Sequence, residues 1–315
     1  MKTTKKTKKP PVAVICLSWN ACGDLRKALR CVKQQTMKPQ KIIIVDSGST
    51  DGTKDMVKKE VPFVDFHPLG KNIGYAAGYN VAFSLVPKNI KYVIVLDQDV
   101  TIDKNYIRNI ITRFEKEPDS TIILMCNLEE PLVKSFGLRE GYIKAYHGSC
   151  FSYRNKFKKF MIYDEKFFAY DNESDLCARL LNRGFRILYY PGCKTVHKKD
   201  STVMNPFRTH LMTRNALWTW WKNARFLDAV ISSVVVMGIF YSKSSRYKMI
   251  PAYFRGVFDA FKGLPYCIRN RDVCKQLSYK DLDDLRKVGK ALEKTKTKPL
   301  VGFFDGVYED YKKFS

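Results

Sequence analysis

Strand-like and helix-like segments alternate through the N-terminal third of the chain, and this alternation limits the possible folds more than any other feature. Short runs rich in β-branched residues, such as KIIIVD at 41–46, are typical of buried strands. Between them, apolar residues recur at helical spacing, as Leu25, Ala28, Leu29 and Val32 do. The expected strands are 11–19, 41–46, 63–67 and 92–97, and the expected helices are 24–35, 49–60 and 75–86. We therefore predict the α/β class, with a mostly parallel central sheet flanked by helices.

Polar side chains follow three of these strands at the point where each strand should end. Ser18 and Asn20 follow the first strand, Asp46 follows the second, and Asp97 and Asp99 follow the fourth. Ligands of parallel sheets bind outside the carboxyl ends of the strands. We therefore expect these side chains to line a common site.

The segment YVIVLDQD, 92–99, carries two carboxylates directly after a buried strand. In extended backbone, Asp97 and Asp99 would point to the same side, where they could face one cation or repel each other. A solvated turn with a helix cap is the alternative. A calcium loop is disfavoured, because Thr101 stands where a third ligand is expected and the turning glycine is missing.

Two common nucleotide-binding motifs are absent. A dinucleotide site needs GxGxxG after the first strand, and a P-loop needs GK[ST]; the chain has neither. A sheet that binds nucleotides without a glycine cradle must neutralise phosphates in another way. A divalent cation held by carboxylates does so, and the two aspartates provide such a site.

Composition defines the remaining possibilities. A chain of 315 residues with 45% hydrophobic residues can bury a real core. Its nine cysteines form an odd number without a CxxC pair, and we see no signal peptide, so reduced thiols in the cytosol are expected rather than disulfides or structural zinc. The net charge of +25 predicts an anionic partner: nucleic acid, nucleotide phosphates or an acidic membrane surface.

A long apolar run, FLDAVISSVVVMGIFY at 226–241, lies within a basic part of the chain. After Asp228 its uncharged stretch is too short to span a bilayer, which needs about 20 apolar residues. A core helix is one interpretation. Tryptophans and cations flank the run: Trp218, Trp220, Trp221, Lys222 and Arg225 before it, and Lys243, Arg246 and Lys248 after it. We therefore favour a peripheral, in-plane contact with an anionic membrane.

Five motifs occur in a characteristic order: VAVICLSWN, IIIVDSGSTDGT, KNIGYAAGYN, LDQD and YDEKFFAYDNESDLCARLLNRGFRILYYPGCKTVH. In this combination the chain resembles the family 2 glycosyltransferases, which have the GT-A fold. The resemblance implies inverting transfer of a sugar from a nucleotide-diphosphate donor to a hydroxyl of a glycan or lipid-linked acceptor in cell-surface polysaccharide synthesis. LDQD and the Arg214–Asn215 pair resemble the rhamnosyltransferase branch.

The same resemblance assigns expected roles to individual residues. Nucleotide-sugar contacts fall on Leu17, Ser18, Asn20, Asp46, Asn72, Gly74 and Asp97. Asp99 is the expected ligand of a Mg²⁺ or Mn²⁺ ion, with Asp97 beside it. His197, which follows the predicted strand RILYYPG, resembles a histidine that completes the metal site in related enzymes.

Inversion requires a base that deprotonates the acceptor, and three carboxylates compete for this role. Asp171, Glu173 and Asp175 lie where a helix begins, so capping and dipole compensation could also explain them. Alignment on Asp175 places Glu173 at the family's base position and leaves both aspartates as alternatives. Arg179, one turn later, is expected to orient a carboxylate.

We predict four parts: a disordered basic tail at 1–11, a GT-A catalytic domain at 12–205, a basic amphipathic helical region at 206–275, and a C-terminal helix and tail at 276–315. The expected location is cytoplasmic, peripheral on the inner face of the cell membrane. A basic nucleic-acid- or membrane-binding protein without transferase activity is the alternative, although nucleic-acid-binding motifs are missing. The oligomeric state is left open.

Overall fold

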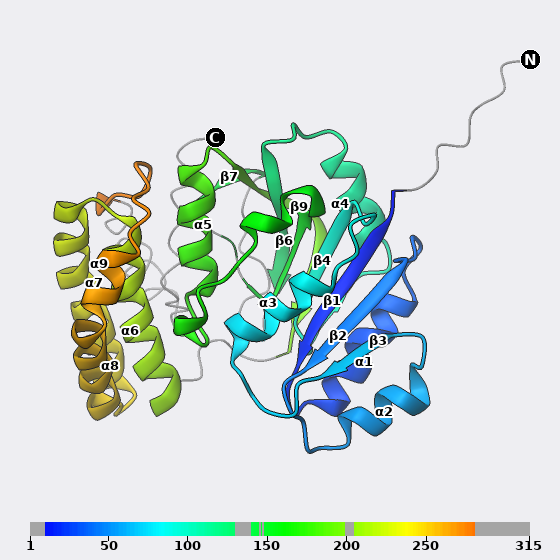
Figure 1. The fold of residues 1–315 in the computed structure, drawn as a ribbon, viewed down its shortest axis with the longest axis horizontal. Helices are drawn as coiled ribbons and strands as arrows, with labels where there is room; N and C mark the ends of the chain where they lie inside the picture. The colour runs from blue at the N-terminus through cyan, green and yellow to red at the C-terminus, as the bar shows by residue number, and fades with distance from the viewer. Residues whose placement is uncertain (1–9, 130–139, 145, 147, 199–204, 281–315) are drawn as a thin grey trace, which may run out of the picture.

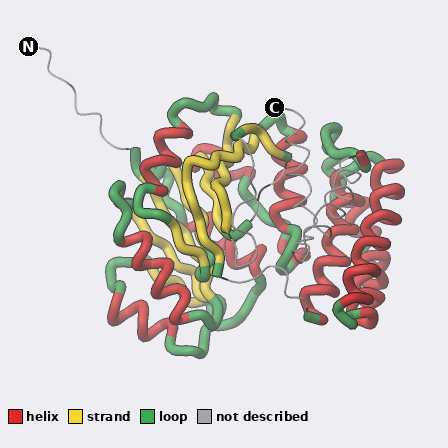
Figure 2. Tube along the Cα trace, turned by 180° about the vertical axis from the view of Figure 1, so that it is seen from behind, coloured by secondary structure: helices red, strands yellow, loops and turns green. Residues whose placement is uncertain are grey.

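The computed structural model describes residues 10–129, 140–144, 146, 148–198 and 205–280. A central sheet is flanked by helices, and further helices stand beside it (Figures 1 and 2). The strands are β1 (Val12–Ser18), β2 (Lys41–Asp46), β3 (Asp65–Pro68), β4 (Tyr92–Leu96), β5 (Val100–Ile102), β6 (Thr121–Glu129), β7 (Gly141–Ile143), β8 (Cys150–Arg154) and β9 (Arg186–His197). The α-helices are α1 (Cys22–Lys33), α2 (Thr53–Glu60), α3 (Tyr75–Leu85), α4 (Tyr106–Phe114), α5 (Asn172–Asn182), α6 (Pro206–Asn223), α7 (Phe226–Arg246), α8 (Ile250–Lys262) and α9 (Leu264–Arg269); η1 (Asn155–Phe160) and η2 (Glu165–Phe167) are 3-10 helices.

The strands form one sheet in the order β3-β2-β1-β4-β8-β6-β9-β5, with β7 also paired to β9. The first four strands in this order pair in parallel, as the alternating sequence predicts. Strand β8 is antiparallel to both of its neighbours, while β6 and β9 are parallel. The prediction of a mostly parallel α/β sheet is therefore confirmed.

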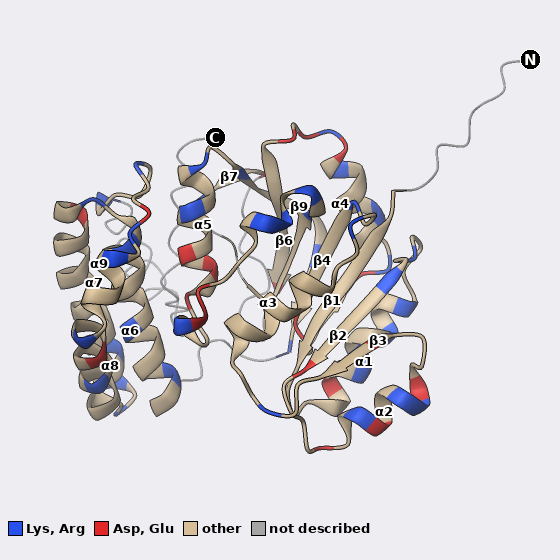
Figure 3. Cartoon of the chain, viewed as in Figure 1, with Lys and Arg blue, Asp and Glu red and all other residues tan. Residues whose placement is uncertain are grey.

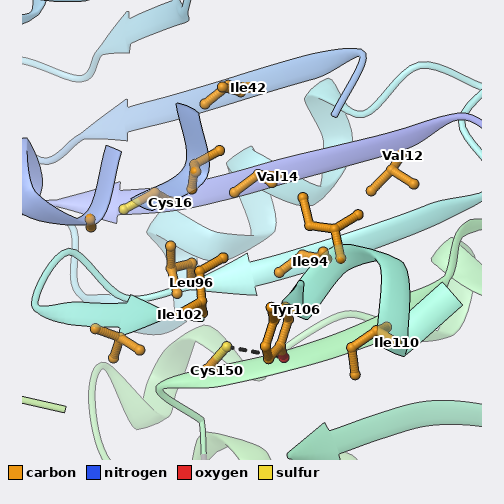
Figure 4. Packing of buried hydrophobic residues seen from close by; sticks show 14 of the residues in the cluster. Val12, Val14, Cys16, Ile42, Ile94, Leu96, Ile102, Tyr106, Ile110 and Cys150 are labelled. Atoms are coloured by element: carbon orange, nitrogen blue, oxygen red, sulfur yellow. Dashed lines mark hydrogen bonds between the residues drawn. The ribbon is translucent and has the colours of Figure 1, made fainter. Parts of the chain in front are cut away.

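Successive residues of the central strands enter two different cores. Ile15 of β1 belongs to a cluster with residues of α3 and α5, whereas Val14 and Cys16 belong to a cluster with residues of α1, α2 and α4. Figure 4 shows part of the second cluster. Helices therefore cover both faces of the sheet, which explains why its central strands are apolar at every position rather than at alternate ones.

The nine cysteines are free thiols, and most are buried. Cys16 and Cys150 belong to the second core, where the Cys150 sulfur lies 3.3 Å from the Tyr106 hydroxyl (Figure 4). No disulfide links any of the nine cysteines in the structure. They serve mainly as small apolar core residues.

Helices α6–α9 pack around a third cluster that also contains Phe167, the last residue of η2. Side-chain contacts between α5 and α6 join this helical extension to the sheet-bearing part. The boundaries at 205/206 and 275/276 remain predictions. Residues 1–9 of the predicted tail at 1–11, and residues 281–315, lie outside the described residues.

The structure changes two expectations about the apolar run. Helix α7 spans 21 residues, and by length and composition it could cross a membrane, so the expectation that it is too short is wrong; one such helix is weak evidence for a span. Trp218, Trp220 and Lys222 are buried in the protein, so they do not form an interfacial flank. Their aromatic rings and alkyl chain pack in the helical core because α6 lies between α5 and the outer helices.

Candidate active site

The predicted polar residues converge at one edge of the sheet. Strands β1, β2 and β4 end there, and Ser18 of β1 stands directly beside Asp46 of β2 in the parallel register. Helix α5 begins at the same edge, with its acidic first turn (Figures 1 and 3). Parallel pairing thus brings together side chains that are far apart in the sequence, as expected.

The loop after β2 folds back over the residue that follows β1. The Asp46 carboxylate accepts hydrogen bonds from the backbone N–H of Ser49 (3.0 Å) and from its hydroxyl (2.5 Å). Asn20 has a left-handed backbone (φ 45°), and its side-chain oxygen accepts the N–H of Thr50 at 2.8 Å. The Ser18 hydroxyl is buried and has no hydrogen-bond partner among the residues that the structure describes. This loop therefore carries a hydrogen-bonded polar cluster beside two buried hydroxyls, those of Ser18 and Ser47, that lack a partner among the described residues.

Asn72 and Gly74 form a turn that packs against the loop before α5. The Asn72 side-chain oxygen accepts the N–H of Gly74 at 2.9 Å. Gly74 has φ 88°, and a Cβ there would lie 2.6 Å from the ring of Phe168. Leu17 packs against Gly78 of α3, where a Cβ would come within 2.5 Å of it. Glycine is thus required at Gly74 by its positive φ and close packing, whereas a side chain at Gly78 would have to displace Leu17.

The two LDQD aspartates lie in a turn and not in extended backbone, as the N–H of Val100 donates to the carbonyl of Asp97. Their relative placement therefore does not follow from strand geometry. The Asp97 carboxylate accepts the hydroxyl of Tyr79 at 2.7 Å. Burial, followed by the charge of Asp99, raises the pKa of Asp97 to about 7. A carboxylate whose pKa is raised by a neighbouring carboxylate favours a cation beside the pair.

His197 lies at the end of β9, since the strand continues past RILYYPG through an irregular register. Its Nε2 is 3.4 Å from an Asp99 carboxylate oxygen. Two carboxylates and one imidazole are chemically suitable ligands for Mg²⁺ or Mn²⁺. Within the described residues, however, no three His, Cys, Asp or Glu side chains form a complete metal site.

Glu173 lies in the first turn of α5 and is half-buried beside the loop that precedes β8, which contains Gly148. Burial raises the pKa of its carboxyl to about 7, and hydrogen bonds from the N–H groups of Glu173 and Gly148 oppose this shift. The Gly148 carbonyl accepts the hydroxyl of Tyr75 at 2.9 Å. The carboxylate is therefore fixed in place, with a pKa suited to general base chemistry.

Asp171 occupies the N-cap position of α5 without capping it through its side chain. One carboxylate oxygen accepts the Ser174 hydroxyl at 3.2 Å, and the other is buried without a partner among the described residues. Burial and the charge of Glu173 raise the pKa of Asp171 to about 8. Ionisation of either carboxyl therefore discourages ionisation of the other.

Asp175 is fully buried in an ion cluster. Its carboxylate pairs with Arg179 (2.9 Å) and with Lys222 of α6 (2.8 Å), and Asn223 donates to it at 3.0 Å. Burial alone would raise the pKa of Asp175, but Arg179 and Lys222 lower it below its ordinary value. Lys222 also pairs with Asp164. Arg179 thus orients a carboxylate, as expected, and Asp175 is not a cap.

The loop before α5 has an unusual backbone. Phe168 (φ 63°), Tyr170 (φ 67°) and Asp171 (φ 58°) all have left-handed conformations, which are costly for residues with a Cβ. Such strain, of order 1–3 kcal/mol per residue, persists only where surrounding contacts impose it. It is concentrated directly before the candidate base.

A sequence model of the family Glycosyl transferase family 2 matches residues 13–178, more than half of the 315-residue chain. The chain belongs to glycosyl transferase family 2. The protein is therefore a glycosyltransferase, and this outcome answers the alternative of a basic binding protein without transferase activity.

Among curated proteins, the transferase is similar to the N-acetylglucosaminyl-diphospho-decaprenol L-rhamnosyltransferase of Mycobacterium tuberculosis, at 22% identity over 243 residues (63% of this chain, 79% of the relative). It is also similar to the O-antigen chain rhamnosyltransferase RfbN of Salmonella typhimurium, at 22% identity over 233 residues (64% and 71%). The predicted resemblance to the rhamnosyltransferase branch is thereby confirmed at the level of distant homology.

Solved structures of GT-A type share the fold. S. aureus TarS 1–349 superposes with a TM-score of 0.57 at 14% identity, covering 97% of this chain and 92% of the other. The mannosyltransferase PcManGT of Pyrobaculum calidifontis, in complex with GDP-Man and Mn²⁺, gives a TM-score of 0.55 at 15% identity, covering 84% of each chain. At these identities the likeness shows the GT-A fold alone.

In the transferase, the Arg214–Asn215 pair holds the strained loop in place. The Asn215 amide donates to the carbonyls of Phe167 (3.0 Å), Ala169 (2.8 Å) and Tyr170 (2.8 Å). Arg214 donates to the carbonyl of Phe167 and stacks over a tryptophan ring. These contacts supply the constraint that the left-handed residues require.

Sequence reasoning missed a second clamp at the edge of the site. The N–H of Trp19 donates to the Gln98 side-chain oxygen (2.8 Å), and the Gln98 amide donates back to the carbonyl of Trp19 (3.1 Å). The Trp19 ring is 50% exposed. The position of Gln98 between the two aspartates was the available signal, but only the turn shows that it faces the first loop. Tyr79 and Gly148, which bind Asp97 and Glu173, carried no sequence signal.

The ion cluster yields a stability prediction. Asp175→Asn should lower the free energy of unfolding by about 3 kcal/mol, because it removes one partner of a buried charge. This loss corresponds to a melting temperature lower by about 6–12 °C. Since the pKa of Asp175 is depressed in the folded protein, its stabilisation is present above about pH 4 and disappears as the pH falls below that value. Thermal denaturation at pH 7 measures the effect.

Asp272→Asn is the matched control, because Asp272 pairs with Arg183 where both side chains are partly exposed. It should cost no more than about 1 kcal/mol. Equal melting temperatures for the two variants would contradict a stabilising role for the buried cluster.

Proposed function

We propose that this transferase moves a sugar from a nucleotide-diphosphate donor to a hydroxyl of a glycan or lipid-linked acceptor, in a metal-dependent reaction of cell-surface polysaccharide synthesis. The observation that carries this proposal is the convergence of a polar cluster, a carboxylate pair and a half-buried glutamate at one edge of the sheet. The names of the two curated relatives support an acceptor of this class.

The donor is proposed to lie across the carboxyl ends of β1, β2 and β4. Asp46 and the orphaned hydroxyl of Ser18 offer polar groups to the nucleoside, and Asn20 fixes the loop beside them. The turn at Asn72 and Gly74 borders the same pocket and packs against the loop that leads to the base. This contact would connect donor binding to the geometry of the transfer site.

Asp99, with Asp97 and His197, would hold a Mg²⁺ or Mn²⁺ ion. When bound, the cation supplies positive charge that offsets the negative charge developing on the departing diphosphate. The raised pKa of Asp97 supports this role, since it shows that ionisation of both carboxylates is unfavourable without a compensating charge. The partial set of ligands also leaves room for donor oxygens.

Glu173 is proposed to act as the base. As the acceptor oxygen bonds to the anomeric carbon, its proton passes to the Glu173 carboxylate. The bond between that carbon and the diphosphate oxygen breaks, and the electron pair leaves with the diphosphate. One displacement of this kind inverts the anomeric centre. Asp175 is a weaker candidate, because two cations and an amide occupy its carboxylate.

The proposed location is the cytoplasmic side of the cell membrane, in peripheral association with its inner face. A lipid-linked acceptor would be available at that surface, and the relative from M. tuberculosis is named for such an acceptor. The excess of basic residues would favour an anionic leaflet.

A panel of nucleotide-diphosphate sugars tests the proposed function. The enzyme is incubated with each donor and with magnesium, manganese or chelator, and release of the nucleoside diphosphate is measured. We expect hydrolysis of one donor class well above the others, with a rhamnose donor as the first candidate, and only with metal. Failure of every nucleotide sugar, with folded protein and both metals, would contradict the proposal.

A further inference from the structure

Helices α7 and α8 each expose a series of large apolar side chains. We define the apolar face as Leu227, Val230 and Val234 of α7 with Phe254, Phe258 and Phe261 of α8. The spacings of three and four residues on α7, and of four and three on α8, place each set on one side of its helix. The three phenylalanines are 54–67% exposed, which is unusual for a cluster of aromatic residues.

The two halves of this face lie on adjoining helices. The rings of Tyr241 and Tyr253 are 5.7 Å apart, and those of Tyr253 and Phe254 are 5.1 Å apart, so aromatic contacts connect α7 to α8. Both helices pack on α6, which contacts α5 in turn. In Figure 1, α7 and α8 lie beyond α6 as seen from the sheet. The apolar face therefore belongs to the outer layer of the molecule.

The surroundings of the apolar face are cationic. Residues 225–269 contain seven Lys or Arg and two Asp. Both aspartates have partners: Asp228 accepts from Ser278, and Asp259 pairs with His210. Figure 3 shows the basic residues on these helices. Exposed apolar side chains that share their helices with several cations are complementary to a surface with an apolar interior and negatively charged headgroups.

We infer that the apolar face of α7 and α8 docks in the plane of an anionic lipid surface. This inference deepens the proposed function, on which it rests for the choice of a lipid-linked acceptor. A second copy of the chain is the poorer occupant, because it would place two cationic rims against each other. In-plane docking also agrees with α7 keeping Ala229, Val236 and Phe240 buried in the helical core, which insertion across the bilayer would expose.

Flotation of the full-length protein tests the inference. Vesicles of phosphatidylcholine alone and vesicles with added phosphatidylglycerol are compared at low and high salt. The wild-type protein should float with the anionic vesicles, and less at high salt. Phe254→Ser/Phe258→Ser/Phe261→Ser should reduce the bound fraction at least about tenfold, since each ring buries apolar area in the lipid.

Phe63→Ser/Ile162→Ser is the matched control, because these side chains are 53% and 52% exposed elsewhere on the molecule. It should float like the wild-type protein. Arg255→Glu/Lys262→Glu keeps the apolar face and should weaken flotation through charge alone. Equal melting temperatures would show that the variants fold.

Several results would overturn the inference. These are undiminished flotation of the triple phenylalanine variant, equal flotation with neutral vesicles, or no flotation of the wild-type protein. If the wild-type protein does not float but self-associates, and the triple phenylalanine variant loses this self-association, the apolar face belongs to a contact with a second copy. If the wild-type protein neither floats nor self-associates, another segment of the chain covers the apolar face. Donor hydrolysis measured on the same samples separates these outcomes from failure of the proposed function.

Discussion

Replacement of Glu173 by glutamine is expected to lower sugar transfer about 10²–10⁴-fold, the usual contribution of general base catalysis. Glutamine keeps the size of the side chain but cannot accept the acceptor's proton. Donor affinity should change little, because backbone N–H groups of α5 and of Gly148 hold this carboxylate, whereas Asp46, which is proposed to face the nucleoside, is held by Ser49. Calorimetry with the donor and turnover with one acceptor measure the two quantities.

The pH profile gives the same prediction a second readout. The carboxylate must be ionised to accept a proton, and burial raises its pKa to about 7. The value of kcat/KM of the wild-type enzyme should therefore rise about tenfold per pH unit below 7 and level off above it. The residual activity of Glu173→Gln should lack this limb.

Glu165→Gln is a suitable control, since Glu165 is exposed and accepts a hydrogen bond from Asn80 outside the site. It should transfer at the wild-type rate. If Glu173→Gln is active and Asp171→Asn is inactive, the base is Asp171, whose buried carboxylate also has a raised pKa.

Asp99→Asn should lower turnover by at least about a hundredfold, and chelator should abolish activity of the wild-type enzyme. The reason is that loss of metal stabilisation of the departing diphosphate costs several kcal/mol in the transition state. Unlike Glu173→Gln, this variant should also bind the donor more weakly when metal is present. Donor titrations with and without Mn²⁺ distinguish the two defects.

Asp55→Asn changes an exposed carboxylate on α2 and serves as the control for loss of one negative charge. Its metal response should match that of the wild-type enzyme. Full activity of Asp99→Asn in the presence of chelator would refute the metal role of this residue.

The sheet could be predicted because short sequence patterns determine where its strands and helices form. Runs such as Tyr92–Leu96 suit a strand covered on both faces, and helical spacing between strands implies parallel crossovers. The role of Trp218 and Trp220 was not predictable in this way. An indole suits a membrane interface and a protein core equally well, and only the packing of α6 between α5 and the outer helices decides between them.

The candidate site was predictable as a set of residues but less so as a geometry. The strand ends placed Ser18 beside Asp46 as expected. The turn at Asp97 and Asp99, by contrast, depends on partners from α3 and β9 that no local pattern reveals. Asp175 looked like a cap or a base, because its counter-charge, Lys222, lies 47 positions away in the chain.

The ion cluster of Asp175, Lys222 and Asp164 has a consequence for engineering chimeric transferases. Exchanging α6–α9 for the helices of another enzyme, in order to transplant acceptor preference, would remove Lys222 and the Asn223 amide together. Helix α5 would then bury an acid, Asp175, that lacks its lysine partner. The replacement helices must therefore provide an ammonium group and an amide at the positions of Lys222 and Asn223, or Asp175 must be replaced as well.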